Sequence, residues 1–137
     1  ADKVYQLDLN DGLNHLHGGN LGFDKKQFHI VRIDEGENEV VIEMSGKSFD
    51  GEGGYPGNLL ISITYTVTAE SITVQYRAVT DQPTIVNLTQ HSYFNLSADP
   101  KNTVLDHSLK ISADYFIPID GDDVFVYNKP SKKPFKK

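Results

Sequence analysis

Two runs of alternating residues, separated by only two positions, constrain this chain more than any other feature. The first run covers Leu59–Thr68 and the second covers Ser71–Thr80. Every second residue of the first run is aliphatic or aromatic, so one face of an extended strand would carry Ile61, Ile63, Tyr65 and Val67. Ala69 and Glu70 between the runs suit a two-residue connection, although they lack the favoured Gly or Asn. The pattern predicts an antiparallel hairpin.

The same period of two recurs along most of the chain. It predicts further strands over about Lys3–Leu9, Phe28–Ile33, Glu39–Ser45, Thr84–Asn95 and His107–Ala113. No segment carries the apolar stripe of an amphipathic helix over three turns. Strands joined by turn-rich segments at intervals of about ten residues predict an all-β fold, an antiparallel β-sandwich or barrel.

The charge is distributed unevenly. A chain of 137 residues has the length of one ordinary domain, which we predict over residues 1–128. Residues 129–137 hold five lysines and no acid, and we predict a basic, disordered tail there. The first 128 residues hold 8 basic and 19 acidic side chains, a net charge of −11. Because such a body repels phosphate backbones, no nucleic-acid partner is expected.

The sequence contains no cysteine, which excludes a disulfide framework and a cysteine-ligated metal site. It also contains no apolar run near the ~18 residues that span a membrane, and no charged-then-apolar leader. We therefore expect no membrane association and predict a cytoplasmic location.

Two short segments place histidines in settings that suit proton transfer. Asn14–Gly19 holds His15 and His17 before two glycines, and Asn87–Leu96 places His91 among hydroxyl, amide and aromatic side chains. Imidazole titrates at about pH 6.5, so histidine exchanges protons readily near neutrality. The structural alternative is a buried histidine satisfied by hydrogen bonds.

Two ligand-binding alternatives follow from the same residues. His15, His17 and His91 would suit an open three-histidine metal site, but their spacing matches no metal fingerprint, so neither a metal nor a cofactor is predicted. The loop Phe49–Asn58 contains two acids among glycines and a proline, which is typical of a solvated turn and, less often, of a calcium loop.

Four motifs follow one another in a fixed order. They are Asn14-His15-Leu16-His17-Gly18-Gly19 with Gly22-Phe23-Asp24, Asp50-Gly51-Glu52-Gly53-Gly54-Tyr55-Pro56-Gly57-Asn58-Leu59, Thr64-Tyr65, and Pro83-Thr84-Ile85-Val86-Asn87-Leu88-Thr89-Gln90-His91-Ser92-Tyr93-Phe94-Asn95-Leu96. Over about residues 3–120 the chain resembles the aldose 1-epimerase family, also called the galactose mutarotases. The last motif is the most specific.

The resemblance implies an antiparallel β-sandwich, the galactose mutarotase-like supersandwich, with a sugar cleft across one sheet. It also implies interconversion of the α and β anomers of free aldohexoses such as galactose or glucose, without a cofactor. By motif, His91 corresponds to the family's general acid at the ring oxygen. His17 corresponds to the histidine that hydrogen-bonds the sugar.

The chain departs from the family in what it lacks. Members are usually longer, and their general base is a glutamate far downstream of the motif that holds His91. A family arginine lies upstream of the motif that holds His17. We therefore expect an incomplete site in this chain, with self-association or a complementary fragment supplying the rest. The alternatives are a non-catalytic carbohydrate-binding or regulatory module, and a purely structural domain.

Overall fold

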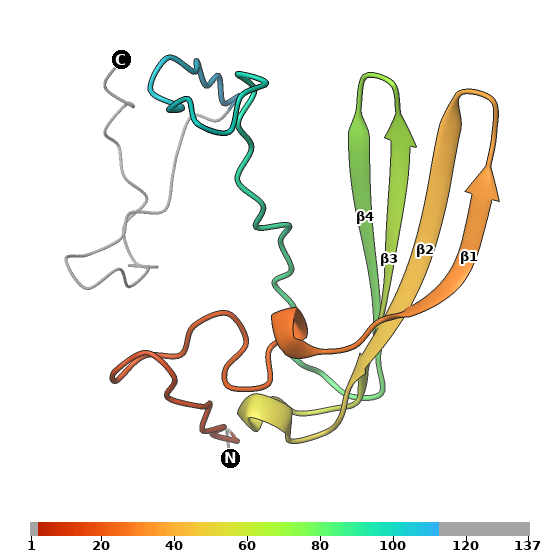
Figure 1. Ribbon diagram of the computed structural model, residues 1–137. Helices are drawn as coiled ribbons and strands as arrows, with labels where there is room; N and C mark the ends of the chain where they lie inside the picture. The colour runs from red at the N-terminus through yellow and green to blue at the C-terminus, as the bar shows by residue number, and fades with distance from the viewer. Residues whose placement is uncertain (1–2, 113–137) are drawn as a thin grey trace. The chain divides into compact units, whose positions relative to one another are not determined.

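The computed structural model describes residues 3–112, which have the antiparallel all-β architecture that the sequence predicts (Figure 1). Four strands pair in sequence order into one sheet. They are β1 (His29–Glu35), β2 (Glu39–Ser48), β3 (Leu59–Thr68) and β4 (Ile72–Thr80), with two short 3-10 helices in the loops, η1 (Phe23–Lys25) and η2 (Glu52–Gly54). The chain divides into two compact units, Ala1–Gln90 and His91–Lys137, and the sheet belongs to the first.

The β3–β4 hairpin confirms the strongest prediction from the sequence, with Ala69 and Glu70 as its connection. The Thr68 N–H donates to the Ser71 carbonyl at 2.9 Å. The Thr68 hydroxyl oxygen accepts the N–H groups of Glu70 at 3.2 Å and Ser71 at 3.0 Å. Because these bonds satisfy the donors of the turn, the hairpin closes without Gly or Asn.

The predicted β1–β2 hairpin is also confirmed, with longer strands than the alternation indicates. β1 continues to Glu35, and β2 continues to Ser48, which pairs with Leu59 at the start of β3. The register between β1 and β2 shifts between Ile30 and Arg32, as at a β-bulge. Hydrogen bonds to the neighbouring strand therefore extend β1 and β2 beyond the residues that the alternation indicates.

The tightest packing in the first unit lies where β2 ends and β3 begins. Ile61 is fully buried and Leu59 is 8% exposed. Gly46 pairs with Ile61 across β2 and β3, and the ring of Phe28 covers this glycine so closely that a Cβ would lie 2.7 Å from the ring. The loop that joins β2 to β3 is therefore attached to the most buried part of the sheet.

Three predicted strands are wrong. Lys3–Leu9, Thr84–Asn95 and the described part of His107–Ala113 form no strand. Alternation assigns side chains to faces, but a strand also needs a neighbouring strand to complete its ladder of hydrogen bonds. Residues 3–9 bond to a loop instead, through the Asp8 N–H and the Gly53 carbonyl at 3.1 Å.

The boundary predicted at residue 128 and the basic tail predicted over residues 129–137 fall outside the described residues, so both stay predictions. Within residues 3–112, no helix has the length and apolar character needed to cross a membrane.

Candidate functional site

His17 lies on a left-handed turn in the first unit. Its φ is 53°, and Gly18 and Gly19 follow with φ of 85° each. Few non-glycine residues adopt positive φ, although histidine is enriched among them. The Asn10 side chain accepts the Leu16 N–H at 2.9 Å and donates to the Leu16 carbonyl at 2.8 Å. The turn is thus braced from Asn10, and the His17 side chain is exposed.

The ring of His15 links this turn to the loop between β2 and β3. Its Nδ1 lies 2.7 Å from the Asp8 carbonyl oxygen, and its Nε2 lies 2.7 Å from the Tyr55 hydroxyl oxygen. A carbonyl only accepts, so Nδ1 carries a proton, and in the neutral ring Nε2 accepts the Tyr55 O–H. The two rings meet edge to face, with centroids 5.3 Å apart and planes at 70°. Both residues stand in the family-like motifs, but the sequence alone did not pair them.

Asp8 fastens the N-terminal segment at the same place. Its N–H donates to the Gly53 carbonyl at 3.1 Å, and its Oδ2 accepts the Asn20 N–H at 3.0 Å. The Asp8 carbonyl oxygen also lies beside His15 Nδ1, so Asp8 contacts three residues: His15, Asn20 and Gly53.

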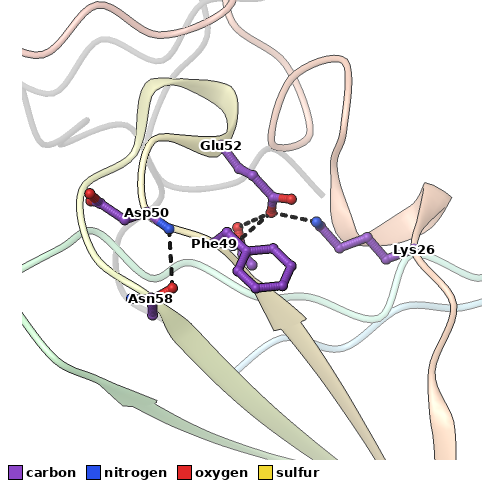
Figure 2. A network of polar contacts seen from close by, with 6 residues as sticks. Lys26, Phe49, Asp50, Glu52 and Asn58 are labelled. Carbon is purple, nitrogen blue, oxygen red and sulfur yellow. Dashed lines mark hydrogen bonds and ion pairs between the residues drawn. The ribbon is translucent and has the colours of Figure 1, made fainter.

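A second link joins the end of η1 to the same loop through Glu52 (Figure 2). One carboxylate oxygen accepts from Lys26 Nζ at 2.5 Å, the Ser48 hydroxyl at 2.7 Å and the Phe49 N–H at 2.9 Å. The side chains of Lys26 and Glu52 are 16% and 22% exposed, so water screens this ion pair only partly. Burial by itself raises the pKa of the Glu52 carboxyl, but the hydrogen bonds and the Lys26 charge outweigh it, and the pKa lies below its ordinary value.

Asp50 and Asp81 fasten the loop to the end of β4. Asp50 Oδ1 accepts the Gly57 N–H at 2.6 Å and Gln82 Nε2 at 2.9 Å, and the Asp50 N–H lies 3.4 Å from Asn58 Oδ1 (Figure 2). Asn58 donates its side-chain amide and its backbone N–H to the Asp81 carboxylate at 2.7 and 2.8 Å. These bonds hold the pKa of Asp81 below its ordinary value. The loop acids predicted to belong to a solvated turn or a calcium loop are thus bonded to protein donors.

His91 opens the second unit and is exposed in an irregular segment, where the sequence predicted a strand. Its ring centroid lies 5.4 Å from that of Tyr93, with the planes at 57°. Further along, His107 Nε2 accepts the Leu96 N–H at 2.8 Å. Contacts between side chains and backbone, in place of a strand ladder, hold this segment.

The two predicted site residues therefore belong to different units, His17 to the first and His91 to the second, and the structure defines the surroundings of each within its own unit. Within residues 3–112, no group of three or more His, Cys, Asp or Glu side chains is arranged to hold a metal ion. The residues that sequence reasoning missed are Asp8, Lys26 and Tyr55, whose contacts join segments far apart in the chain.

The Glu52→Gln variant is expected to lower the free energy of unfolding by about 1–2 kcal/mol at neutral pH, because the amide oxygen accepts the same donors without the charge that strengthens these bonds and pairs with Lys26. The folded-state pKa of Glu52 lies below its unfolded value. Its contribution is therefore fully present above the ordinary value of 4.5 and is lost as pH falls through the folded-state pKa. Urea unfolding of both proteins from neutral pH down to about pH 3 measures the difference.

The matched control is Glu37→Gln in the exposed connection between β1 and β2. This variant should leave the pH dependence of stability unchanged. A constant difference between wild type and Glu52→Gln on acidification would show that the carboxylate charge contributes nothing.

Comparison with known proteins shows which protein family this chain is similar to. The family model for aldose 1-epimerase matches residues 1–133. The galactose mutarotase of Sus scrofa is 46% identical over 118 residues, which cover 86% of this chain and 33% of that protein. The aldose 1-epimerase of Haemophilus influenzae is 39% identical over 124 residues, which cover 89% of this chain and 35% of that protein.

Among solved structures, the crystal structure of galactose 1-epimerase from Lactobacillus acidophilus NCFM matches with a TM-score of 0.79 and 32% identity, covering 93% of this chain and 37% of that one. This match confirms the predicted β-sandwich class, of which residues 3–112 build one four-stranded sheet. The chain spans about one third of the length of the curated relatives it matches. On this agreement of motifs, family model and fold, the chain belongs to the aldose 1-epimerase family.

Proposed function

We propose that this chain forms part of the sugar site of an aldose 1-epimerase, with His17 as a sugar-binding residue and His91 as the general acid. The substrate in this proposal is a free aldohexose such as galactose, which the relatives' name galactose mutarotase supports. The observation that carries the proposal is the exposed His17 on a braced left-handed turn. Positive φ at a non-glycine residue persists only where the surroundings hold it, and such residues cluster at ligand sites.

The chemistry in this proposal is a reversible proton transfer. The protonated His91 imidazole gives its proton to the ring oxygen while a base takes the proton of the C1 hydroxyl. The bond between C1 and the ring oxygen breaks, C1 becomes an aldehyde, and rotation before closure yields the other anomer. Closure returns both protons, so the sugar is neither oxidised nor reduced, and the reaction needs no cofactor.

The base of this pair is not assigned to any residue of the chain. The sequence spans about one third of its relatives, which supports a base contributed by further polypeptide or by a second chain. Because an acid and a base that act together lose most of their effect when either is missing, the assay requires the protein in which the site is complete.

The His17→Asn variant of the protein that carries this sequence is expected to raise KM for galactose about tenfold, with a smaller change in kcat. Asparagine tolerates positive φ, so the turn is kept while the reach of the imidazole is lost. A hydrogen bond made to both substrate and transition state appears mainly in KM. Polarimetry of freshly dissolved α-galactose over a range of concentrations measures both constants.

The control is His29→Asn, at an exposed position of β1. It should leave both constants as in wild type. An unchanged KM in His17→Asn would remove His17 from the sugar site, and a wild-type protein that neither converts nor binds aldoses would overturn the proposed function as a whole.

A further inference from the structure

We propose that Tyr55 is a positioning residue for the sugar site, which acts through His15 to fix the turn that carries His17. This inference rests on the proposed function of His17. The contacts that link Tyr55 to the turn, from Tyr55 to His15 and from His15 to Asp8, lie within the first unit and do not depend on that function.

The link begins with a ring that is held at both nitrogens. His15 stands two residues before His17, and its Nδ1 and Nε2 each have an oxygen at 2.7 Å. The Asp8 carbonyl fixes the tautomer, so the neutral ring offers Nε2 as an acceptor that Tyr55 fills. A ring bonded at opposite edges has little freedom to tilt or slide, so its position defines the chain beside it.

Tyr55 is suited to be the donor. Its ring is partly buried against that of His15, and burial raises the pKa of its hydroxyl above the ordinary value. The hydroxyl therefore keeps its proton near neutral pH and can donate it to Nε2 of the neutral His15 ring.

The backbone of the turn lies close against that ring. At Gly19 a Cβ would lie 3.0 Å from His15 Cε1 and 2.8 Å from Asp8 Oδ2, so the buried backbone of the turn is packed between the two. A displacement of the His15 ring would therefore press on Gly19, which follows His17 by two residues in the same turn.

The other end of the link is anchored. Tyr55 follows η2 in the loop that Glu52 ties to Lys26 and that Asp50 ties to Gln82 beyond β4. The loop also leaves from the most tightly packed end of the sheet, at Leu59 and Ile61. Tyr55 thus belongs to an anchored loop, and through His15 it adds a second support to the turn of His17 that Asn10 braces.

The Tyr55→Phe variant removes one oxygen and keeps the ring that meets His15 edge to face. In the protein that carries this sequence, we expect KM for galactose to rise roughly threefold to thirtyfold while kcat changes less. We also expect the imidazole ¹⁵N signal of His15 Nε2 to shift as it loses its donor, with a shift of the His17 signals alongside it. The matched control is Tyr76→Phe on β4, which should leave KM and both sets of histidine signals unchanged.

These readouts separate positioning from a general loss of stability. A purely structural role would lower the unfolding midpoint yet leave KM unchanged well below it, and that result would overturn the proposal. Shifted His15 signals with unchanged His17 signals would also overturn it, because the link would end at His15.

Failure of the proposed function would look different from failure of the link. If the wild-type protein has no activity on aldoses and binds none, the ¹⁵N signals alone decide the link. Shifts at both histidines in Tyr55→Phe would then support it, and unchanged His17 signals would reject it.

Discussion

Replacing His91 with alanine is expected to lower kcat for galactose anomerisation about 10²–10⁴-fold, with little change in the free energy of unfolding. The first effect is the usual contribution of a positioned general acid. The second follows from exposure, because His91 lies in an irregular segment where its replacement creates no cavity. Polarimetry at saturating galactose, in the protein that carries this sequence, measures kcat, and urea unfolding measures stability.

The control for His91→Ala is His29→Ala, another exposed histidine, which should retain wild-type kcat. A loss of less than about tenfold in His91→Ala would assign the acid role to another group. Retained sugar binding together with lost turnover would separate the proposed chemical role of His91 from the proposed binding role of His17.

The largest expected effect on stability comes from Gly54→Ala, at about 2–5 kcal/mol. Gly54 has φ of 85°, and a Cβ there would lie 1.9 Å from the Gln6 carbonyl oxygen. The substitution therefore adds a steric clash to the backbone strain and pushes residues 3–10 away from the loop. The bond from the Asp8 N–H to the Gly53 carbonyl should break with it, so faster amide exchange at Asp8 is expected beside the lower urea midpoint.

The matched control for Gly54→Ala is Gly51→Ala. Gly51 lies three residues earlier in the same loop with nearly the same φ, 86°, but a Cβ there would meet nothing within 4 Å. This variant should lose only the cost of a left-handed alanine, about 1–2 kcal/mol. Equal losses in the two variants would show that the N-terminal segment does not pack against Gly54.

The hairpin of β3 and β4 was predictable from the sequence because its information is local. Period-two alternation assigns each side chain to a face. Two such runs separated only by Ala69 and Glu70 are placed to pair as an antiparallel hairpin. The β1–β2 hairpin followed for the same reason, although its ends shifted. The family could also be identified from the sequence, because its motifs are contiguous runs of residues.

The strand predicted over Thr84–Asn95 shows where local information ends. The sequence assigned this segment to a strand, yet the described structure leaves it irregular. A strand is a property of a pair of segments, because its N–H and C=O groups need a second backbone to bond with. The pattern specifies the faces of such a segment but not the presence of its neighbour.

The same distinction between local sequence information and tertiary contacts applies to the candidate site. The sequence by itself determined the residue types and their motifs: imidazoles at positions 17 and 91, glycines beside the first of them, and a loop of acids and glycines. Only the tertiary structure decided that Tyr55 bonds to His15 across 40 residues and that Lys26 bonds to Glu52 across 26. Such contacts depend on angstrom-scale distances between folded loops, and the packed end of the sheet sets those distances. Motif order and alternation carry no measure of them.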